Sequence, residues 1–279
     1  MTRRRMRKPV IQIKSDTEIG KMRDAGLIVA ATLAALRDAI EPGLTAADLD
    51  AIAERCIRDA GAVPSFKGYR GFPATICVSV NDEIVHGIPD TNKKLRDGDV
   101  VSIDCGAIID GWHGDAAITV PVGTMAPELR RLLEVCEEAL WRGLAQVVPG
   151  GRLTDIGHAV ESYVRAHGGY GIVREYVGHG IGSEMHQDPQ VPNYGRPGRG
   201  PALQRGVVLA VEPMVNLGTQ HTKLLDDGWT VVTRDGMPSA HFEHTVTPTE
   251  EGPWVLTSPD GGRSRFAELL GAGVKGDAS

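Results

Sequence analysis

The feature that most constrains the fold is the segment VVSIDCGAIIDGWHGDAAITV, at residues 100–120. Its two apolar arms have the composition of strands inside a sheet, and the DG pair between them is typical of the two-residue turn of a type I′ β-hairpin. With this turn, Asp104 faces Ala117 and Asp115 faces Gly106. The two aspartates then lie on one face as diagonal neighbours, with Cα atoms roughly 7 to 8 Å apart. The segment therefore predicts two carboxylates side by side within a sheet.

Two adjacent buried carboxylates require a positive charge nearby. Without one they repel each other and take up protons, and Asp104 has no Lys or Arg close to it in the sequence. A divalent metal removes this penalty, and the spacing suits two acids that bind a pair of ions about 3.5 to 4 Å apart. We expect Gly106 to leave the space beside Asp115 open. The simpler interpretation is that each aspartate caps a turn or joins a buried ion pair.

The second half of the chain contains further candidate ligands. Glu212 ends the apolar run VVLAV, and Glu243 lies in SAHFEHTV, where strand alternation puts it on the same face as His241 and Thr245. His179, in YVGHGIG, is flanked by glycines that allow the backbone to pass close to a ligand. A lone histidine is more often an ordinary core or surface residue. Four acids and a histidine in apolar or glycine-rich contexts together favour a shared metal site.

The predicted elements occur twice in the same order. Helices are expected at residues 16–40, 45–61, 126–147 and 153–167, and a strand at 75–80 precedes the hairpin. Pro-Gly separates the helices of each pair, at 42–43 and again at 149–150. GDVVSID, at 98–104, also aligns with GVVLAVE, at 206–212, acid on acid. This repetition indicates two αα-plus-sheet halves around a pseudo-twofold axis, with the acids meeting near the axis.

The composition indicates an ordinary globular protein. The chain has 279 residues, 41% of them hydrophobic and 24% charged, and we expect a single domain at 13–258, between a basic tail at 1–12 and a C-terminal tail at 259–279. The four cysteines are scattered, which fits reduced thiols in a cytoplasmic protein. The longest apolar run, at 27–36, is too short to span a membrane.

The charge distribution indicates which kinds of molecule the protein can bind. The net charge of −6 argues against nucleic acid as the main ligand. The start of the chain, MTRRRMRK, is strongly basic. Such a run is usually a solvated tail, and the alternative is an arm that docks on RNA or another anionic surface.

Several segments of the chain resemble the type I methionine aminopeptidase family. The resemblance extends from about Ser15 to Thr257. It rests on VHGIP with His86, SIDCG with Asp104, GWHGDAA with Asp115, GHGIG with His179, MHQDPQVPNYG with His186, VEPM with Glu212 and HFEHTV with Glu243. It implies an α+β pita-bread fold, two divalent metal ions (Co, Mn, Fe or Zn), and removal of the N-terminal methionine from nascent polypeptides, mainly when the second residue is small. With neither the insertion of type II enzymes nor a zinc module, it is similar to the bacterial type I enzymes.

The resemblance also assigns roles to residues. It implies metal ligands at Asp104, Asp115, His179, Glu212 and Glu243, with Asp115 and Glu243 bridging. Glu212 would pass a proton toward the leaving amine, His186 would donate a hydrogen bond to the oxyanion, and His86 would contact the peptide nitrogen of the departing chain. The methionine pocket would be lined by Tyr69, Phe72, Cys77, Met185 and Trp229. Met185 occupies a position where part of the family has an aromatic residue, so its flexible thioether would loosen the pocket wall.

Two other functions remain open from the sequence. The first is a Xaa-Pro aminopeptidase or dipeptidase with the same ligands, although such enzymes usually carry a large N-terminal domain, for which the residues before His86 leave little room. The second is a non-catalytic pita-bread binding protein, which the complete ligand set disfavours. We expect a monomer, with ribosome association through the basic tail as a further hypothesis.

Overall fold

The computed structural model describes residues 10–274. Its helices are α1 (Asp16–Ala39), α2 (Ala46–Asp59), the 3₁₀ turn η1 (Tyr69–Gly71), α3 (Pro127–Leu144), α4 (Leu153–His167) and α5 (Arg263–Val274). Its strands are β1 (Val63–Pro64), β2 (Ile76–Val80), β3 (Glu83–Val85), β4 (Val100–Ile109), β5 (Trp112–Pro121), β6 (Gly171–Ile172), β7 (Gly178–Gly180), β8 (Gln187–Val191), β9 (Leu209–Val211), β10 (Met214–Asn216), β11 (Thr222–Leu224), β12 (Val231–Thr233), β13 (Ser239–His241), β14 (Glu243–Thr249) and β15 (Gly252–Val255). Within the described residues, none of these helices is long and apolar enough to cross a membrane.

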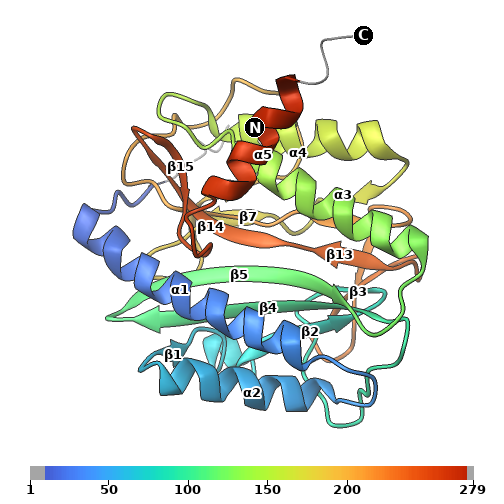
Figure 1. Cartoon of the computed structure of the whole chain (residues 1–279). Helices are drawn as coiled ribbons and strands as arrows, with labels where there is room; N and C mark the ends of the chain where they lie inside the picture. The colour runs from blue at the N-terminus through green and yellow to red at the C-terminus, as the bar shows by residue number, and fades with distance from the viewer. Residues whose placement is uncertain (1–9, 275–279) are drawn as a thin grey trace, which may run out of the picture.

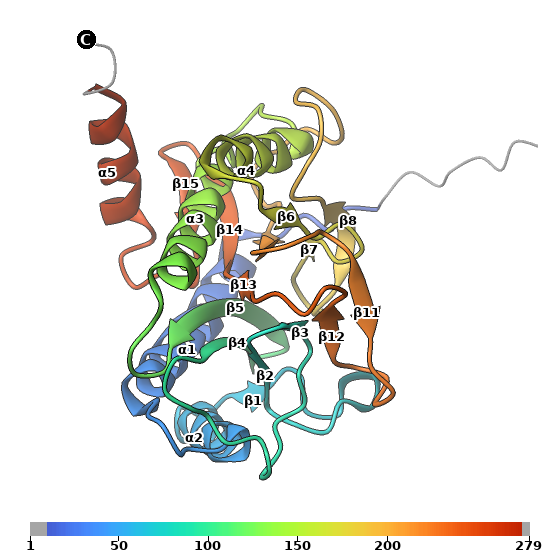
Figure 2. The ribbon, with the colours of Figure 1, turned by 90° about the vertical axis from the view of Figure 1, so that its right-hand side faces the viewer.

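One large antiparallel sheet organises the molecule. Its strand order is β1-β4-β5-β14-β9-β7-β8, with β2 also paired to β4 and β15 to β14. The long β4–β5 hairpin crosses the middle of the molecule beneath α1 (Figure 1). Helices α1, α2 and α3 lie on one side of this sheet, and the small β11–β12 sheet lies on the other (Figure 2). The helices therefore cover one face and leave the opposite face to the loops and short strands.

The register of the β4–β5 hairpin agrees with the prediction. Asp104 pairs with Ala117 and Gly106 pairs with Asp115. Asp110 and Gly111 both have positive φ, of 49° and 80°, as a type I′ turn requires. The turn chemistry thus determines which face of the sheet the two aspartates share.

The predicted duplication appears in the order of the strands. The inner strands β5 and β14 pair with each other, and β4 and β9 flank them on either side. Helices α1 and α2 precede β4 and β5 in the chain, as α3 and α4 precede β9 and β14. The two halves therefore meet at the β5–β14 pair, which we call the seam.

Local signals explain where the first two helices begin. Ser15 and Glu18 form the predicted capping box of α1, and Thr45 and Asp48 form another at α2, each satisfying backbone N–H groups of the first turn. Helix α1 then packs closely on β5, since a Cβ added at Gly114 would lie 2.6 Å from the backbone nitrogen of Gly26.

Both ends of the chain differ from the expected tails where the structure describes them. Within the expected C-terminal tail, Arg263–Val274 form α5, and Phe266 and Leu269 pack against the main core. At the other end, Ile11 also packs against that core, and Gln12 donates a hydrogen bond to Ser183. The basic residues 3–8 lie outside the described residues.

Candidate metal centre and substrate pocket

A cavity of about 150 Å³ lies where the strands of the two halves converge. All twelve residues predicted for the site line this cavity, together with two that were not predicted. They are Tyr69, Phe72, Cys77, His86, Asp104, Asp115, His179, Met185, His186, Glu212, Trp229 and Glu243, with Phe66 and Arg70 in addition. The cavity has an acidic end and an apolar end, which are formed in different ways.

The four acids come from adjacent strands of the large sheet. Asp104 lies on β4, Asp115 on β5 and Glu243 on β14, and Glu212 directly follows β9. Because these four strands are neighbours, residues far apart in the sequence come together at the seam. Asp115 and Glu243 are almost fully buried, with 3% and 2% of their surface exposed.

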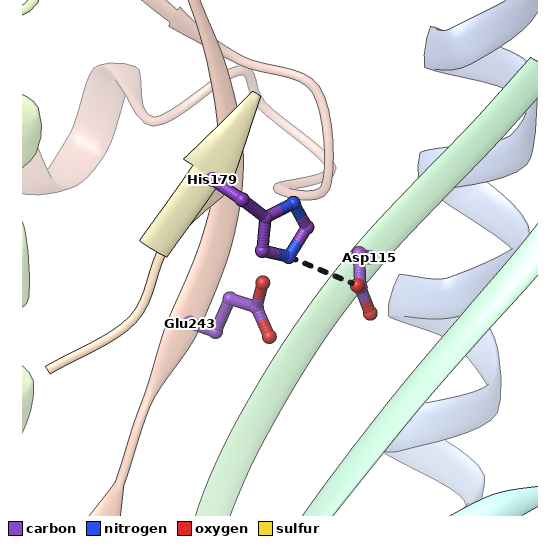
Figure 3. Close-up of side chains that lie close together, drawn as sticks. All are labelled: Asp115, His179 and Glu243. Carbon is purple, nitrogen blue, oxygen red and sulfur yellow. Dashed lines mark ion pairs between the residues drawn. The ribbon is translucent and has the colours of Figure 1, made fainter. Parts of the chain in front are cut away.

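His179 completes the cluster from β7. Its Nε2 lies 3.6 Å from Glu212 Oε1 and 4.0 Å from Asp115 Oδ2. Ligand atoms of Asp115, His179 and Glu243 all lie within 4.8 Å of one another, and Figure 3 shows the three side chains pointing toward one another from separate strands. The Nδ1 of His179 lies 3.0 Å from the carbonyl oxygen of Gly180. A proton on Nδ1 would satisfy that carbonyl and leave the Nε2 lone pair directed at the acids.

Burial makes the charged forms of these groups unfavourable. It raises the pKa of Asp104 to about 7 and that of Glu212 to about 8. It also raises the pKa values of Asp115 and Glu243 well above their usual range, and the neighbouring carboxylates add to the shift. The same burial lowers the pKa of His179 to about 3, so its imidazole is neutral at pH 7. The cluster therefore requires positive charge that residues 10–274 do not supply to it.

The hydrogen-bonding state of the acids tests whether a metal fits. Asp104 Oδ1, Asp115 Oδ1 and Glu243 Oε1 are buried and have no hydrogen-bond partner among the described residues. Such orphaned acceptors are rare in proteins unless a ligand satisfies them. Carboxylate oxygens with one imidazole nitrogen form a donor set suited to Mn, Fe, Co or Zn. The residues present therefore fit a divalent metal.

Two threonine hydroxyls form hydrogen bonds across the seam, close to the acids. The hydroxyl of Thr245 accepts a hydrogen bond from the backbone N–H of Asp115, at 3.1 Å, and donates one to its carbonyl oxygen, at 2.8 Å. At the other end of the β5–β14 pair, Thr119 bonds the N–H and carbonyl of His241 in the same way, at 2.8 and 2.7 Å. Only Thr245 restrains a predicted ligand directly. His241 lies behind the cluster, with Nε2 3.6 Å from Glu212 Oε2.

The apolar end of the cavity is a cluster of aromatic and sulfur-containing side chains. It contains Phe66, Phe72, Cys77 and Met185, with Tyr69 and Trp229 packed against it. The rings of Phe72 and Trp229 meet edge to face, with centroids 5.1 Å apart. These groups together form an apolar wall at this end of the cavity.

The prediction that Gly106 leaves open space is wrong. A Cβ at Gly106 would lie 2.8 Å from both Phe66 Cε1 and Ser65 Cβ. These two side chains fill the room beside the hairpin, so the glycine permits close packing of the pocket wall. Phe66 and Arg70 belong to the same SFKGYRGFP segment as two predicted pocket residues, and its aromatic and glycine content was the signal that could have revealed them.

His86 and His186 both line the cavity. His186 Nδ1 is 3.0 Å from the hydroxyl of Tyr69, and the two rings stack with centroids 5.4 Å apart. His86 packs edge-on against Tyr176 and Trp229. The pKa of each imidazole is lowered to about 4, mainly by desolvation, and for His186 the charge of Arg70 contributes to this shift. Both rings are therefore neutral at pH 7.

Comparison of the sequence with known protein families identifies the family to which the chain belongs. Residues 20–250 match the family model described as Metallopeptidase family M24. Because this match spans most of the chain, the protein belongs to metallopeptidase family M24.

The relatives narrow the class further. A methionine aminopeptidase of Clostridium acetobutylicum is 54% identical over 89% of this chain and 99% of its own length. The crystal structure of a methionine aminopeptidase from Thermotoga maritima matches with a TM-score of 0.87 and 44% identity, over 89% of this chain and all of the other. An Xaa-Pro dipeptidase from Bacillus anthracis matches with a TM-score of 0.70 and 26% identity, over 89% of this chain but only 62% of the dipeptidase. Within the family, the chain groups with the methionine aminopeptidases, and the α+β architecture is the predicted pita-bread fold.

Proposed function

We propose that this protein is a metal-dependent hydrolase that removes the N-terminal methionine from nascent polypeptides and peptides, mainly when the second residue is small. The observation that carries the proposal is the single cavity in which an acidic cluster adjoins a narrow apolar pocket. The relatives named methionine aminopeptidase support the same reaction.

In this proposal five side chains hold two divalent ions. The residues that would hold them are Asp104, Asp115, His179, Glu212 and Glu243. The orphaned buried oxygens and the neutral imidazole of His179 support this assignment. When bound, the ions supply an acidified water and a Lewis acid for the scissile carbonyl. Co, Mn, Fe and Zn are all compatible with the donor set.

Three residues move or hold protons around the scissile bond. Glu212 passes a proton to the leaving amine, and the position of its carboxylate at the acidic end of the cavity, 3.6 Å from His179 Nε2, supports such a role. His186 donates a hydrogen bond to the developing oxyanion, with Tyr69 orienting its ring from Nδ1. His86 contacts the peptide nitrogen of the departing chain.

The apolar end selects the first residue. Tyr69, Phe72, Cys77, Met185 and Trp229 surround the methionine side chain, and Phe66 extends this wall. An unbranched thioether fits between aromatic faces and gains favourable sulfur–aromatic contacts. A charged side chain would lose its hydration there without a partner.

The setting of the reaction is also part of the proposal. We place the protein in the cytoplasm, as a monomer, with the basic residues 3–8 available to contact ribosomal RNA near emerging chains. Removing residues 1–9 and measuring co-sedimentation with ribosomes tests the last point. Unchanged co-sedimentation would exclude this role for the basic segment.

Turnover of Met-Ala-Ser during titration with Mn(II), Fe(II), Co(II) or Zn(II) tests the function. We expect cleavage after methionine that depends on the metal and is lost with a chelator or with Asp104→Asn. Ala-Pro-Ser serves as the matched substrate for the Xaa-Pro alternative. Efficient cleavage of Ala-Pro-Ser with indifference to methionine would replace the proposal by that alternative, and no metal-dependent cleavage of either peptide would favour a binding protein.

A further inference from the structure

Arg70 is the one Lys or Arg side chain among the residues that line the cavity. The other titratable lining groups are the four acids, Cys77, Tyr69 and three histidines, none of which carries a permanent positive charge. Arg70 is exposed, whereas the acids and most of the apolar wall are buried or half-buried. A permanent positive charge therefore lies at the mouth of the cavity.

Arg70 has an uncommon backbone conformation. Arg70 has φ 49° and ψ 24° inside η1, a left-handed conformation that costs free energy for any residue with a Cβ. The turn is closed on both sides, because the N–H of Gly68 donates to the carbonyl of Phe72, at 2.8 Å, and the N–H of Phe72 donates to that of Tyr69, at 2.9 Å. A glycine would fit this turn with less strain. The side chain therefore has a role that the turn itself does not explain.

The guanidinium lies close to the proposed catalytic groups. Its carbon is 5.3 Å from the centroid of the Tyr69 ring, and the hydroxyl of that tyrosine contacts His186. One aromatic ring thus separates the charge of Arg70 from the imidazole that faces the scissile carbonyl in the proposed function. A peptide leaving the cavity on this side would pass within reach of the guanidinium.

The charge of Arg70 is not neutralised by the described part of the protein. No carboxylate of residues 10–274 forms an ion pair with it, whereas Lys67, three residues earlier in the same loop, pairs with Glu54 at 2.8 Å. Lys67 and Arg70 therefore differ in their ion-pair partners and in their position relative to the cavity. Lys67 pairs with Glu54 and does not line the cavity, whereas Arg70 lines the cavity and has no ion-pair partner among the described residues.

We propose that Arg70 is a specificity-determining residue that binds a carboxylate on the substrate just beyond the scissile bond. The inference rests on the proposed function and deepens it. When methionine fills the apolar end and the scissile bond lies at the acids, the following residues must leave through the mouth. The carboxylate is either an acidic side chain at the third residue or the terminal carboxylate of a short peptide, and both present the same planar group to the guanidinium fork.

The expected effect is modest because the pair is exposed to solvent. A single ion pair of this kind changes affinity by about threefold to fivefold at low salt. It also offsets the repulsion that an acidic peptide meets from the chain's net charge of −6. We therefore expect the preference to appear in KM more than in kcat, and to weaken as salt screens it.

Two peptide pairs distinguish the sources of the carboxylate. Met-Ala-Glu-Ser-amide against Met-Ala-Gln-Ser-amide isolates the acidic side chain, and Met-Ala-Gln-Ser against its amide isolates the terminal carboxylate. Each pair is measured with the metal-loaded wild type, Arg70→Gln, Arg70→Lys and Lys67→Gln. The last variant removes a neighbouring positive charge of the same loop and leaves the cavity lining intact.

We expect the wild type to favour the charged member of at least one pair by about threefold to fivefold in kcat/KM. Arg70→Gln should bring that ratio close to one while neutral peptides are still cleaved, Arg70→Lys should retain part of it, and Lys67→Gln should keep it. A wild-type ratio of one or less in both pairs, or a ratio that survives Arg70→Gln, would overturn the inference and leave the proposed function standing. If the wild type cleaves none of the methionine peptides, both fail together.

Discussion

The two halves of the chain build one cavity by different means. The first half reaches it through the long β4–β5 hairpin, whose register places Asp104 and Asp115 on one face, and through the loop that carries Phe66 to Phe72. The second half uses short strands, and His179, Glu212 and Glu243 each lie within or directly after one of them. The acids of both halves lie at strand positions near the seam, whereas the aromatic and histidine residues that line the cavity lie mostly in loops.

The strands and the loops thus have different roles: the strands position the acids, and the loops form most of the cavity wall. Paired strands fix the acids relative to one another, because a change of register would move them to the opposite face. Loops are free to differ between the halves, and so the first half supplies most of the apolar wall while the second supplies the imidazoles of His179 and His186. The two halves therefore resemble each other in the strands that carry the acids at the seam. They differ in the side chains that form the cavity walls.

The largest effect is expected when one acid is removed from either half. Asp115→Asn and Glu243→Gln each remove one carboxylate from the seam, and we expect each to lower kcat/KM on Met-Ala-Ser by at least about a hundredfold, since even outer-shell changes at metal sites cost ten- to a hundredfold. Circular dichroism serves as the folding control. A folded variant of one half with near-normal activity would show that the halves do not contribute equally to the metal centre.

The two seam threonines provide a matched pair for the next effect. Thr245→Val removes the hydroxyl that brackets Asp115, and we expect metal affinity measured by calorimetry to fall about tenfold. Thr119→Val removes the equivalent hydroxyl at His241, which is not among the five proposed ligands, and should change affinity by less. Equal losses in the two variants would mean that the hydroxyls support the seam as a whole and do not position one ligand.

Arg23 connects the halves outside the site. This residue of α1 donates hydrogen bonds to the backbone carbonyls of Val255, Leu256, Ser258 and Pro259, all in the second half. We expect Arg23→Met to lower the free energy of unfolding by about 2 kcal/mol, because partly buried carbonyls lose a charged donor.

Lys21 is the matched control for Arg23. It lies on the same helix but pairs at the surface with Asp110 of its own half, and Lys21→Met should cost less than about 1 kcal/mol. Denaturant titration measures both variants. Similar costs for the two would contradict a special role for Arg23 in joining the halves.

The smallest expected effect is a change in the free energy of unfolding at the start of α5. This helix has no counterpart in the first half. Asp260 accepts hydrogen bonds from the N–H groups of Ser264 and Gly262, and the bonds from Ser264 hold its pKa below the usual range. A folded pKa below the unfolded value of about 3.9 stabilises the protein above that pH, and the gain is lost as the pH falls. Asp260→Ala should therefore cost about 1 kcal/mol at pH 7, and less near pH 3.

The control for this last prediction is Asp226→Ala, which removes an exposed aspartate elsewhere. Thermal unfolding across pH 3 to 7 measures both variants. An unchanged difference between wild type and Asp260→Ala over this range would show that the carboxylate charge does not stabilise the start of α5.

What could be predicted from the sequence is mainly what local chemistry determines. The DG turn predicted the hairpin register, and Ser15 with Glu18 predicted the start of α1, because both depend on neighbouring residues. The family resemblance predicted twelve residues that line one cavity, and eight of them lie within the seven motifs on which it rests. The turn and the capping box agree with the structure because their chemistry depends on neighbouring residues, whereas the cavity residues were predicted from the family resemblance and not from local chemistry.

What could not be predicted depends on tertiary contacts. Helix α5 forms in a glycine-containing segment with little apolar periodicity, and its start depends on Asp260 while the chain before it is held by Arg23. The room beside Gly106 is filled by Phe66, which is distant in the sequence. The hydroxyl of Thr245 reaches Asp115 across the seam, and no local pattern shows that pairing.

Anomalous diffraction from crystals of the protein loaded with Mn(II) tests the central claim most directly. The account predicts two peaks about 3.5 to 4 Å apart at the seam, with Asp115 and Glu243 between them and Asp104, His179 and Glu212 completing the ligands. Peaks absent from the seam, or ions bound by the side chains of one half alone, would contradict it.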